Sequence, residues 1–286
     1  MADLFPPDSL IRRVNAEPAL LFGAGRALLL QLAHPNVAQG VADHSDFQHN
    51  PFKRLIGTLE ATYAVVFGSE ALAAGVGRRI KSIHDHVTGP GYQANDPANL
   101  LWVHATLADS ALSCYEGLVA PLSAAERETY YREMATVGEV FGCPRSAQPA
   151  DVDAFNVYFD AQIHTLRVTD VGRALARDIV APRLPGNLQV PLAPALALHR
   201  LVAVGTLPEP LRDQFGFDWT AAQARHLDRV QRMARATFRT TPRTVRVAPI
   251  HLGGRLLLRR ATRHSAEFDA KRASDGVSPR TPLGGG

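Results

Sequence analysis

Helical periodicity constrains the fold of this chain more than any other feature. Apolar residues recur every three or four positions in six segments, and that spacing gives an α-helix one apolar face. Alternation at period two, which would indicate strands, is nearly absent. The segments are residues 19–33, 69–87, 97–117, 124–141, 171–179 and 220–238. With 286 residues, 46% of them hydrophobic, we predict one all-α domain with a sizeable core.

Signals for helix starts support this prediction. Asp96 precedes Pro97, which places an acid at an N-cap and a proline at the first helical position. Ser123 and Glu126 have the spacing of a capping box. Both pairs come directly before periodic segments, so helices are expected to begin there.

Glycine and proline divide the chain further. They predict a loop over residues 86–97 and, with four prolines, irregular structure over residues 182–194. The C-terminal residues 263–286 end in three glycines and are expected to be a disordered tail. We therefore expect an N-terminal arm over residues 1–13 and one helical domain over residues 14–262.

Composition excludes several classes of protein. Two cysteines, Cys114 and Cys143, cannot build a disulfide scaffold or a four-cysteine metal site, and they fit a reducing compartment. The N-terminus lacks the basic start and apolar middle of a signal peptide. The longest apolar run, residues 27–33, is too short to span a membrane. A cytoplasmic protein without a membrane span is expected.

Arginines also recur at helical spacing near the C-terminus, a pattern that would suit nucleic acid. They are Arg225, Arg229, Arg232 and Arg235. The net charge of only +4 and the interleaved Asp228 favour a solvated helix face. No nucleic-acid partner is therefore expected.

His104 lies at the centre of the apolar face of residues 98–113. A histidine there is buried and neutral, and its ring nitrogens need partners. Ala108 and Ala111 on the same stripe would leave room for a flat ligand in a buried apolar pocket, as beside an axial haem ligand. From position alone, a core histidine bonded to a carbonyl or another side chain is the simpler interpretation.

The preceding helical segment places donors beside an apolar stripe. Ala73, Val76, Ile80, Ile83 and Val87 form the stripe. The polar residues around it are Arg78, Arg79, Lys81, Ser82, His84 and His86. Such groups could hold anions such as haem propionates or act on bound oxygen. The alternative is a solvated basic face.

Arg26 lies inside an apolar helical stretch, where an unpaired charge would be costly. It needs a buried anion, such as a propionate or an acidic substrate group, or a structural salt bridge to an acid such as Glu60. Both interpretations stay open. Other basic residues nearby are His34, His44, His49 and Arg54.

Several chemistries lack their motifs. Glu-x-x-His, the ligand pattern of di-iron carboxylate bundles, is absent, and so is the Cys-x-x-Cys-His of covalent haem attachment. Nucleotide-binding glycine motifs and the Gly-x-Ser-x-Gly of hydrolases are absent too. Cys143, which would give a thiolate haem ligand, precedes Pro144 and fits a turn better.

Three stretches resemble a known family: LLLQLAHPNVAQGVADHSDF, NPFKRLIGTLEATYAVVFG and RRIKSIHDHVTGPGYQANDPANLLWVHATLADS. They are similar to the mostly helical oxygenase domain shared by rubber oxygenase, the latex-clearing protein, and the fungal MpaB-type oxygenase. The resemblance runs from about Val14 to Arg259. Many bacterial members of that group have no assigned function.

The resemblance implies a b-type haem bound through a histidine, which by position is His104 in the WVH stretch. The rubber-oxygenase pattern of an arginine, two residues, a lysine and a hydroxyl residue falls on Arg78, Lys81 and Ser82, with serine in place of threonine. These three are the implied catalytic residues. A register shifted by one residue leaves Arg79 and His84 as cofactor-binding candidates, together with Arg26.

We therefore expect a haem b-dependent oxygenase, with its iron on His104, that acts on a small apolar or prenylated molecule with dioxygen. Its electron donor is not identified by the sequence. The absence of a signal peptide favours a small intracellular substrate over rubber. The alternative is a non-catalytic protein that binds haem or another hydrophobic ligand, although the density of arginine and histidine argues against an inert carrier.

Overall fold

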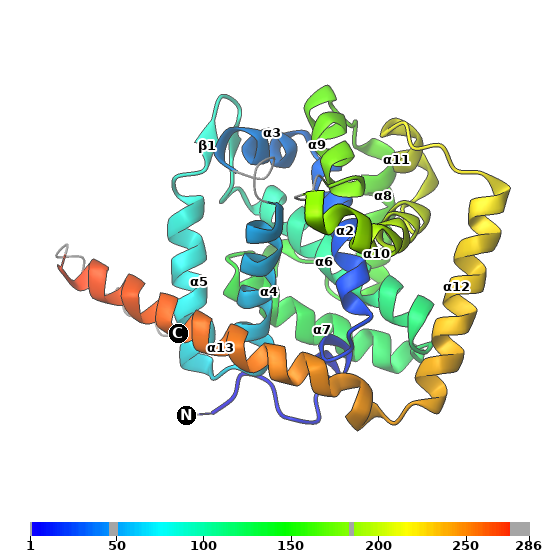
Figure 1. Ribbon diagram of the computed structural model, residues 1–286. Coiled ribbons are helices and arrows are strands. Elements are labelled where there is room, and N and C mark those ends of the chain that lie inside the picture. The colour runs from blue at the N-terminus through cyan, green and yellow to red at the C-terminus, as the bar shows by residue number, and fades with distance from the viewer. Residues whose placement is uncertain (1, 46–50, 183–185, 275–286) are drawn as a thin grey trace.

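In the computed structural model, which describes residues 2–45, 51–182 and 186–274, α-helices make up nearly all of the regular structure (Figure 1). Of residues 51–55 and 186 the backbone alone is described. The predicted all-α single domain is confirmed. The helices are α1 (Leu10–Asn15), α2 (Leu20–Ala33), α3 (Pro35–His44), α4 (Pro51–Phe67), α5 (Glu70–His84), α6 (Pro97–Leu118), α7 (Ala124–Val140), α8 (Val152–Thr165), α9 (Asp170–Val180), α10 (Gly186–Gly205), α11 (Glu209–Gln214), α12 (Ala221–Thr240) and α13 (Arg243–Ser274).

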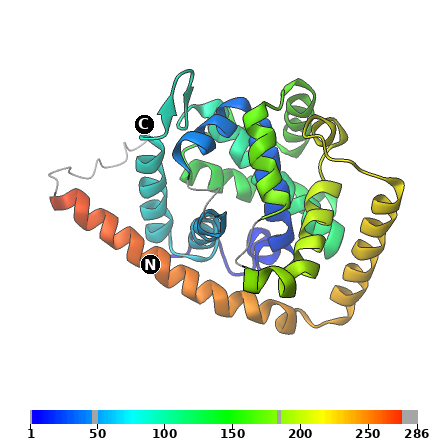
Figure 2. The ribbon, with the colours of Figure 1, turned by 45° about the horizontal axis from the view of Figure 1, so that its top comes forward.

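Helices α2 and α6 pack against each other at the centre of the molecule, and the other helices surround them (Figures 1 and 2). Their contact is largely apolar, with Leu29, Leu30 and Trp102 completely buried. The indole Nε1 of Trp102 donates a hydrogen bond to the carbonyl of Leu30 over 3.0 Å. This bond satisfies the one polar atom of the largest core side chain and fixes α6 against α2.

The predicted helix starts are confirmed. Asp96 accepts a hydrogen bond from the backbone N–H of Ala98 at the start of α6. Ser123 and Glu126 form a complete capping box at the start of α7. Hydrogen bonds from the Ser123 backbone, Arg13 and the Ser123 side chain lower the pKa of Glu126 to about 2.

Both segments that were predicted to be irregular contain regular structure. Residues 86–97 contain a small antiparallel hairpin of β1 (Thr88–Gly89) and β2 (Tyr92–Gln93). Residues 182–194 are not wholly irregular as predicted, because α10 begins at Gly186 and includes Pro191 and Pro194. That part of α10 is exposed, so water can bond the carbonyls that the prolines leave without a donor.

The N-terminal arm packs on the body of the protein, and the C-terminal end is more ordered than expected. Leu10 and Ile11, inside the predicted arm, are buried in α1. At the other end, α13 continues through Ser274, although residues 263–286 were expected to be disordered. Ser265 is buried there and Asp269 pairs with Arg78 of α5, so the contacts of α13 with the body extend beyond residue 262. Residues 275–286 lie outside the described residues.

Candidate functional site

His104 lies near the middle of α6, as predicted, on the side that faces the core. Its side chain is buried, and Leu100, Leu101 and Ala108 on the same helix are buried with it. Burial lowers the pKa of His104 from 6.5 to about 4. The imidazole is therefore neutral at pH 7, with one nitrogen that donates and one that accepts.

Neither ring nitrogen of His104 has a hydrogen-bond partner among the described residues. The simpler interpretation of the sequence, a core histidine bonded to a carbonyl or another side chain, is therefore not the arrangement that the structure has. Nearly all buried polar groups in proteins are paired, because leaving one unpaired costs about 1–3 kcal/mol. The accepting nitrogen of this imidazole therefore has a lone pair without a partner.

The last turn of α7 lies directly against the ring. A Cβ built at Gly138 would lie 3.0 Å from the Nε2 and Cδ2 atoms of His104, and 2.9 Å from the Nε2 of Gln148. Gln148 donates to the carbonyls of Ala135 and Cys143 over 3.1 and 2.9 Å, while its Oε1 has no partner. A residue without a side chain is thus needed at position 138, and unpaired polar atoms from two segments occur together there.

Helix α5 reaches the same turn of α7. A Cβ built at Gly77 would lie 2.4 Å from the carbonyl oxygen of Val140, two residues beyond Gly138. The turn therefore contacts His104 on one helix and the middle of α5 on another. The predicted apolar stripe of α5 is only partly covered, because Val76 is buried whereas Ile83 is 54% exposed.

Two of the three predicted catalytic residues of α5 pair with carboxylates of the chain itself. Arg78 pairs with Asp269 of α13 over 2.9 Å, and Lys81 pairs with Asp85 over 3.1 Å. Both pairs are largely exposed. Ser82 is partly buried, and its backbone carbonyl lies 2.7 Å from the Nδ1 of His86.

Arg79, one of the predicted cofactor-binding residues, belongs to a buried ion cluster instead. The carboxylate of Glu60 on α4 is only 2% exposed and pairs with Arg79 over 3.0 Å. It also pairs with Arg260 over 2.9 Å and with His264 over 2.8 Å, both from α13. This cluster connects α4, α5 and α13. His84 is partly buried in the last turn of α5.

Arg26 has a structural salt bridge. Its guanidinium pairs with Asp109 of α6, donates to the hydroxyl of Ser110 over 3.0 Å and donates to the carbonyl of Thr206 over 2.9 Å. The acid that it needs is thus Asp109, and Glu60 has other partners. Of the nearby basic residues, His34 is partly buried and His44 is exposed. His49 and the Arg54 side chain lie outside the described residues.

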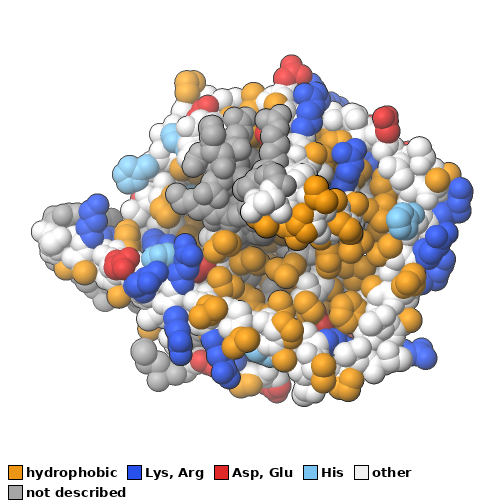
Figure 3. All heavy atoms as spheres, viewed as in Figure 1, with side chains coloured by type: hydrophobic (Ala, Val, Ile, Leu, Met, Phe, Trp, Pro, Cys, Tyr) orange, Lys and Arg blue, Asp and Glu red, His pale blue; other side chains and the backbone are white. Residues whose placement is uncertain are grey.

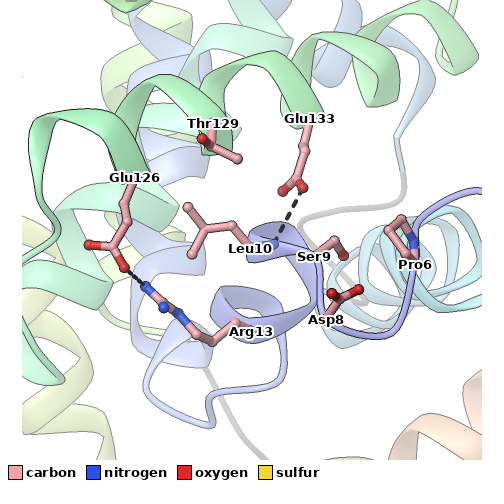
Figure 4. A pocket seen from close by; sticks show the side chains of 8 residues that line it. All are labelled: Pro6, Asp8, Ser9, Leu10, Arg13, Glu126, Thr129 and Glu133. Atoms are coloured by element: carbon pink, nitrogen blue, oxygen red, sulfur yellow. Dashed lines mark hydrogen bonds and ion pairs between the residues drawn. The ribbon is translucent and has the colours of Figure 1, made fainter.

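A surface pocket between α1 and α7 contains none of the predicted site residues (Figure 4). Several of its polar groups have structural partners: Arg13 pairs with Glu126, and Glu133 accepts the backbone N–H groups of Leu10 and Ile11. These bonds attach the first helix to the body. The lining residues are Pro6, Asp8, Ser9, Leu10, Arg13, Glu126, Thr129 and Glu133.

Thiol and multi-ligand metal chemistry have little support from the described residues. Burial raises the pKa of Cys143 to about 11, so its thiol stays protonated at pH 7. In the described ranges, no group of three His, Cys, Asp or Glu side chains could hold a metal ion.

Gly138 and Gln148 were not among the residues predicted from the sequence. A glycine inside a helical pattern often has a packing reason, so Gly138 in the segment 124–141 carried a usable signal. Gln148 carried none, because the approach of its loop to α6 depends on tertiary packing.

Comparison with known proteins gives two relatives and a family. The chain is 25% identical over 225 residues to the uncharacterised proteins Mb2261 of Mycobacterium bovis and Rv2237 of Mycobacterium tuberculosis, over 75% of this chain and 87% of theirs. No solved structure matches. A family model described as "ER-bound oxygenase mpaB/B'/Rubber oxygenase, catalytic domain" matches residues 11–237, which include His104 and all of α5. The chain therefore belongs to the mpaB and rubber oxygenase catalytic domain family, which supports a general role as an oxygenase.

Proposed function

We propose that this chain is a haem b-dependent oxygenase that acts on a small apolar or prenylated organic molecule with dioxygen. One observation carries the proposal: His104 is buried at the centre of α6 with both ring nitrogens unpartnered. Because the chain belongs to an oxygenase family, we expect His104 to serve as the ligand of a redox cofactor. Haem iron in proteins is commonly held by one proximal histidine.

The donor set fits haem better than a bare metal ion. A bare catalytic ion usually needs three protein ligands, and the described residues contain no such group. A porphyrin supplies four nitrogens itself, so one imidazole is sufficient. When bound, haem would supply the one-electron and dioxygen chemistry that no side chain has.

Residues of this chain would have three tasks around that group. His104 would ligate the iron through a ring nitrogen that has no hydrogen-bond partner, and the last turn of α7, which lies against Nε2, would have to move aside. The apolar side chains of α5 are Ile80 and the 54% exposed Ile83. They would cover the apolar surface of the bound group and exclude water from it. Arg78 and Lys81 would have to leave Asp269 and Asp85 to act on the reactants, and such exposed pairs are weak.

The second candidate is a non-catalytic protein that binds haem or a hydrophobic ligand. The observation that favours it is the engagement of Arg78, Arg79 and Arg26 with carboxylates of the chain itself. In that case His104 would bind the group, and the basic residues would stabilise the fold. Turnover distinguishes the two candidates.

The test of haem binding is the visible spectrum of the purified chain with haem supplied. We expect a Soret band at one haem per chain, and a loss of at least about 100-fold in haem affinity in His104→Ala. His34→Ala is the matched control, because His34 also has a buried ring nitrogen without a partner and a pKa lowered by burial. A wild-type chain that takes up no haem, or equal losses in the two variants, would contradict the proposal.

Oxygen uptake then separates the enzyme from the carrier. Oxygen uptake by the haem-loaded chain, supplied with a chemical reductant, is measured with a prenylated aromatic compound and again with its saturated analogue. Consumption that requires the double bond indicates an oxygenase. A spectrum with a Soret band but no substrate-dependent uptake across a panel of alkenes indicates the non-catalytic binder.

A further inference from the structure

The first half of α10 is apolar, uncharged and uncovered. Residues 187–199 contain no Asp, Glu, Lys or Arg. Val190 is 79% exposed, and Leu188 and Leu192 are 44% and 40% exposed. Contrary to the prediction from the sequence, residues 27–33 are not the longest apolar stretch. Among the described residues, Asn187–Gly205 is the one stretch long and apolar enough to cross a membrane, and only 22% of it is buried. Exposed apolar side chains grouped in this way indicate an interaction surface.

The second half of α10 belongs to the core. Val202, Ala203 and Val204 are each at most 3% exposed. If the helix left the body to span a bilayer, these buried side chains would lose their packing. The exposed half can therefore insert shallowly into an apolar layer while the remainder stays in the protein.

Positive charge is concentrated in the two C-terminal helices, α12 and α13. Residues 221–274, which form α12 and α13, contain 13 Lys and Arg but only 3 Asp and Glu, a net charge of +10. The remaining chain has a net charge of −6. Five arginines occupy one side of α12, opposite the buried Leu227; all are exposed and none has an ion pair in the described part of the chain. They are Arg225, Arg229, Arg232, Arg235 and Arg239.

The outer side of α13 combines both features. Val245, Leu252 and Leu256, spaced by seven and four residues, share one side of the helix and are 62–68% exposed. The exposed Arg259 and Arg263 follow on the same side. Figure 3 shows hydrophobic side chains spread between α10 and α13, with Lys and Arg side chains at the margins over α13 and α12.

We propose that this face docks on the surface of an anionic phospholipid bilayer. The apolar half of α10 and the outer stripe of α13 would enter the headgroup boundary, and the arginines of α12 and α13 would contact lipid phosphates. Apolar side chains flanked by cations are what interfacial binding requires. A second copy of the chain would bring two strongly positive surfaces together, and nucleic acid would leave the apolar side chains uncovered.

The test is co-sedimentation of the full chain with phosphatidylcholine vesicles, with and without phosphatidylglycerol. We expect binding that requires the anionic lipid and weakens with added salt. Val190→Asp, at an exposed position, should lower the partition coefficient about tenfold. Arg229→Gln combined with Arg232→Gln should lower it about 30-fold.

Matched controls change the same chemistry elsewhere on the chain. Val157→Asp alters a 73% exposed valine of α8, and Arg132→Gln with Arg177→Gln removes two exposed charges from α7 and α9. Both controls should bind like the wild type. The proposal fails if anionic vesicles are not bound, or if test and control variants lose binding equally. It also fails if Val190→Asp converts a dimer to a monomer without lowering vesicle binding. Binding to duplex DNA that is unaffected by Val190→Asp would contradict it as well. None of these readouts depends on haem, so the docking surface and the proposed oxygenase function can fail separately.

Discussion

Helices α6 and α5 each contain polar residues that were predicted from the sequence to have chemical roles. In the structure these residues have opposite environments. His104 of α6 is buried and has no partner. Arg78 and Lys81 of α5 are exposed, and each has a carboxylate beside it. Exposed ion pairs form at little free-energy cost, whereas an unpaired buried group is costly. Pairing within the chain therefore accounts for Arg78 and Lys81, whereas it leaves both ring nitrogens of His104 unaccounted for.

The largest effect on stability should come from the ion cluster that anchors α5. Glu60→Ala would leave Arg79, Arg260 and His264 without their shared carboxylate. Because removal of one member of a buried ion group is strongly destabilising, we expect a loss of about 3 kcal/mol in the free energy of unfolding. Urea denaturation measures it.

Glu139→Ala is the control, since Glu139 is an exposed carboxylate of α7. It should change stability by less than about 0.5 kcal/mol. A loss below about 1 kcal/mol in Glu60→Ala would show that the cluster does not anchor α5, and the contrast between the two helices would then weaken.

The burial of His104 predicts how the haem-free chain responds to pH. The pKa of His104 is about 4 in the fold, against an ordinary 6.5, so between these values the unfolded chain binds a proton that the folded chain does not. This contribution to stability is complete above pH 6.5 and is lost as the pH falls toward 4. The loss should be about 3 kcal/mol.

Urea denaturation of the wild type and of His104→Leu between pH 7 and pH 4 measures this contribution as a difference. Leucine does not titrate, so the variant should lose less stability on acidification. His226→Leu, at an exposed histidine of α12, should keep the wild-type profile. Parallel profiles for wild type and His104→Leu would mean that His104 gains a partner or water in solution.

Much of the fold and the position of His104 follow from the sequence, because the period of α6 survives in the folded chain. Apolar neighbours one and two turns away were sufficient to place His104 inside. Partners that are distant in sequence were not predictable. Arg26 pairs with Asp109, 83 residues away, and the sequence offered Glu60 equally well. Prolines misled the prediction at α10, because exposure to water makes them tolerable there.

Gly138→Ala tests the fit around the imidazole. Alanine normally stabilises a helix interior by up to about 1 kcal/mol relative to glycine, but here its Cβ would lie within 3.0 Å of the ring and the Gln148 amide. We expect a net loss of about 1 kcal/mol and weaker haem binding. Gly253→Ala in α13 is the control, since nothing lies within 4 Å of a Cβ there. Equal gains in both variants would show that the ring moves away freely.

The smallest stability effects should come from the exposed pairs of α5. Arg78→Ala and Lys81→Ala each remove one partner of a largely exposed ion pair, so we expect changes below about 1 kcal/mol. Oxygen uptake of the haem-loaded variants, measured beside stability, decides what these residues do. A drop of tenfold or more at unchanged stability would mean that the side chains leave Asp269 and Asp85 in the loaded protein, and α5 would then join α6 in the site. Unchanged uptake would leave the chemistry to His104 and the bound group, because exposed pairs that affect neither stability nor turnover are only part of a solvated surface.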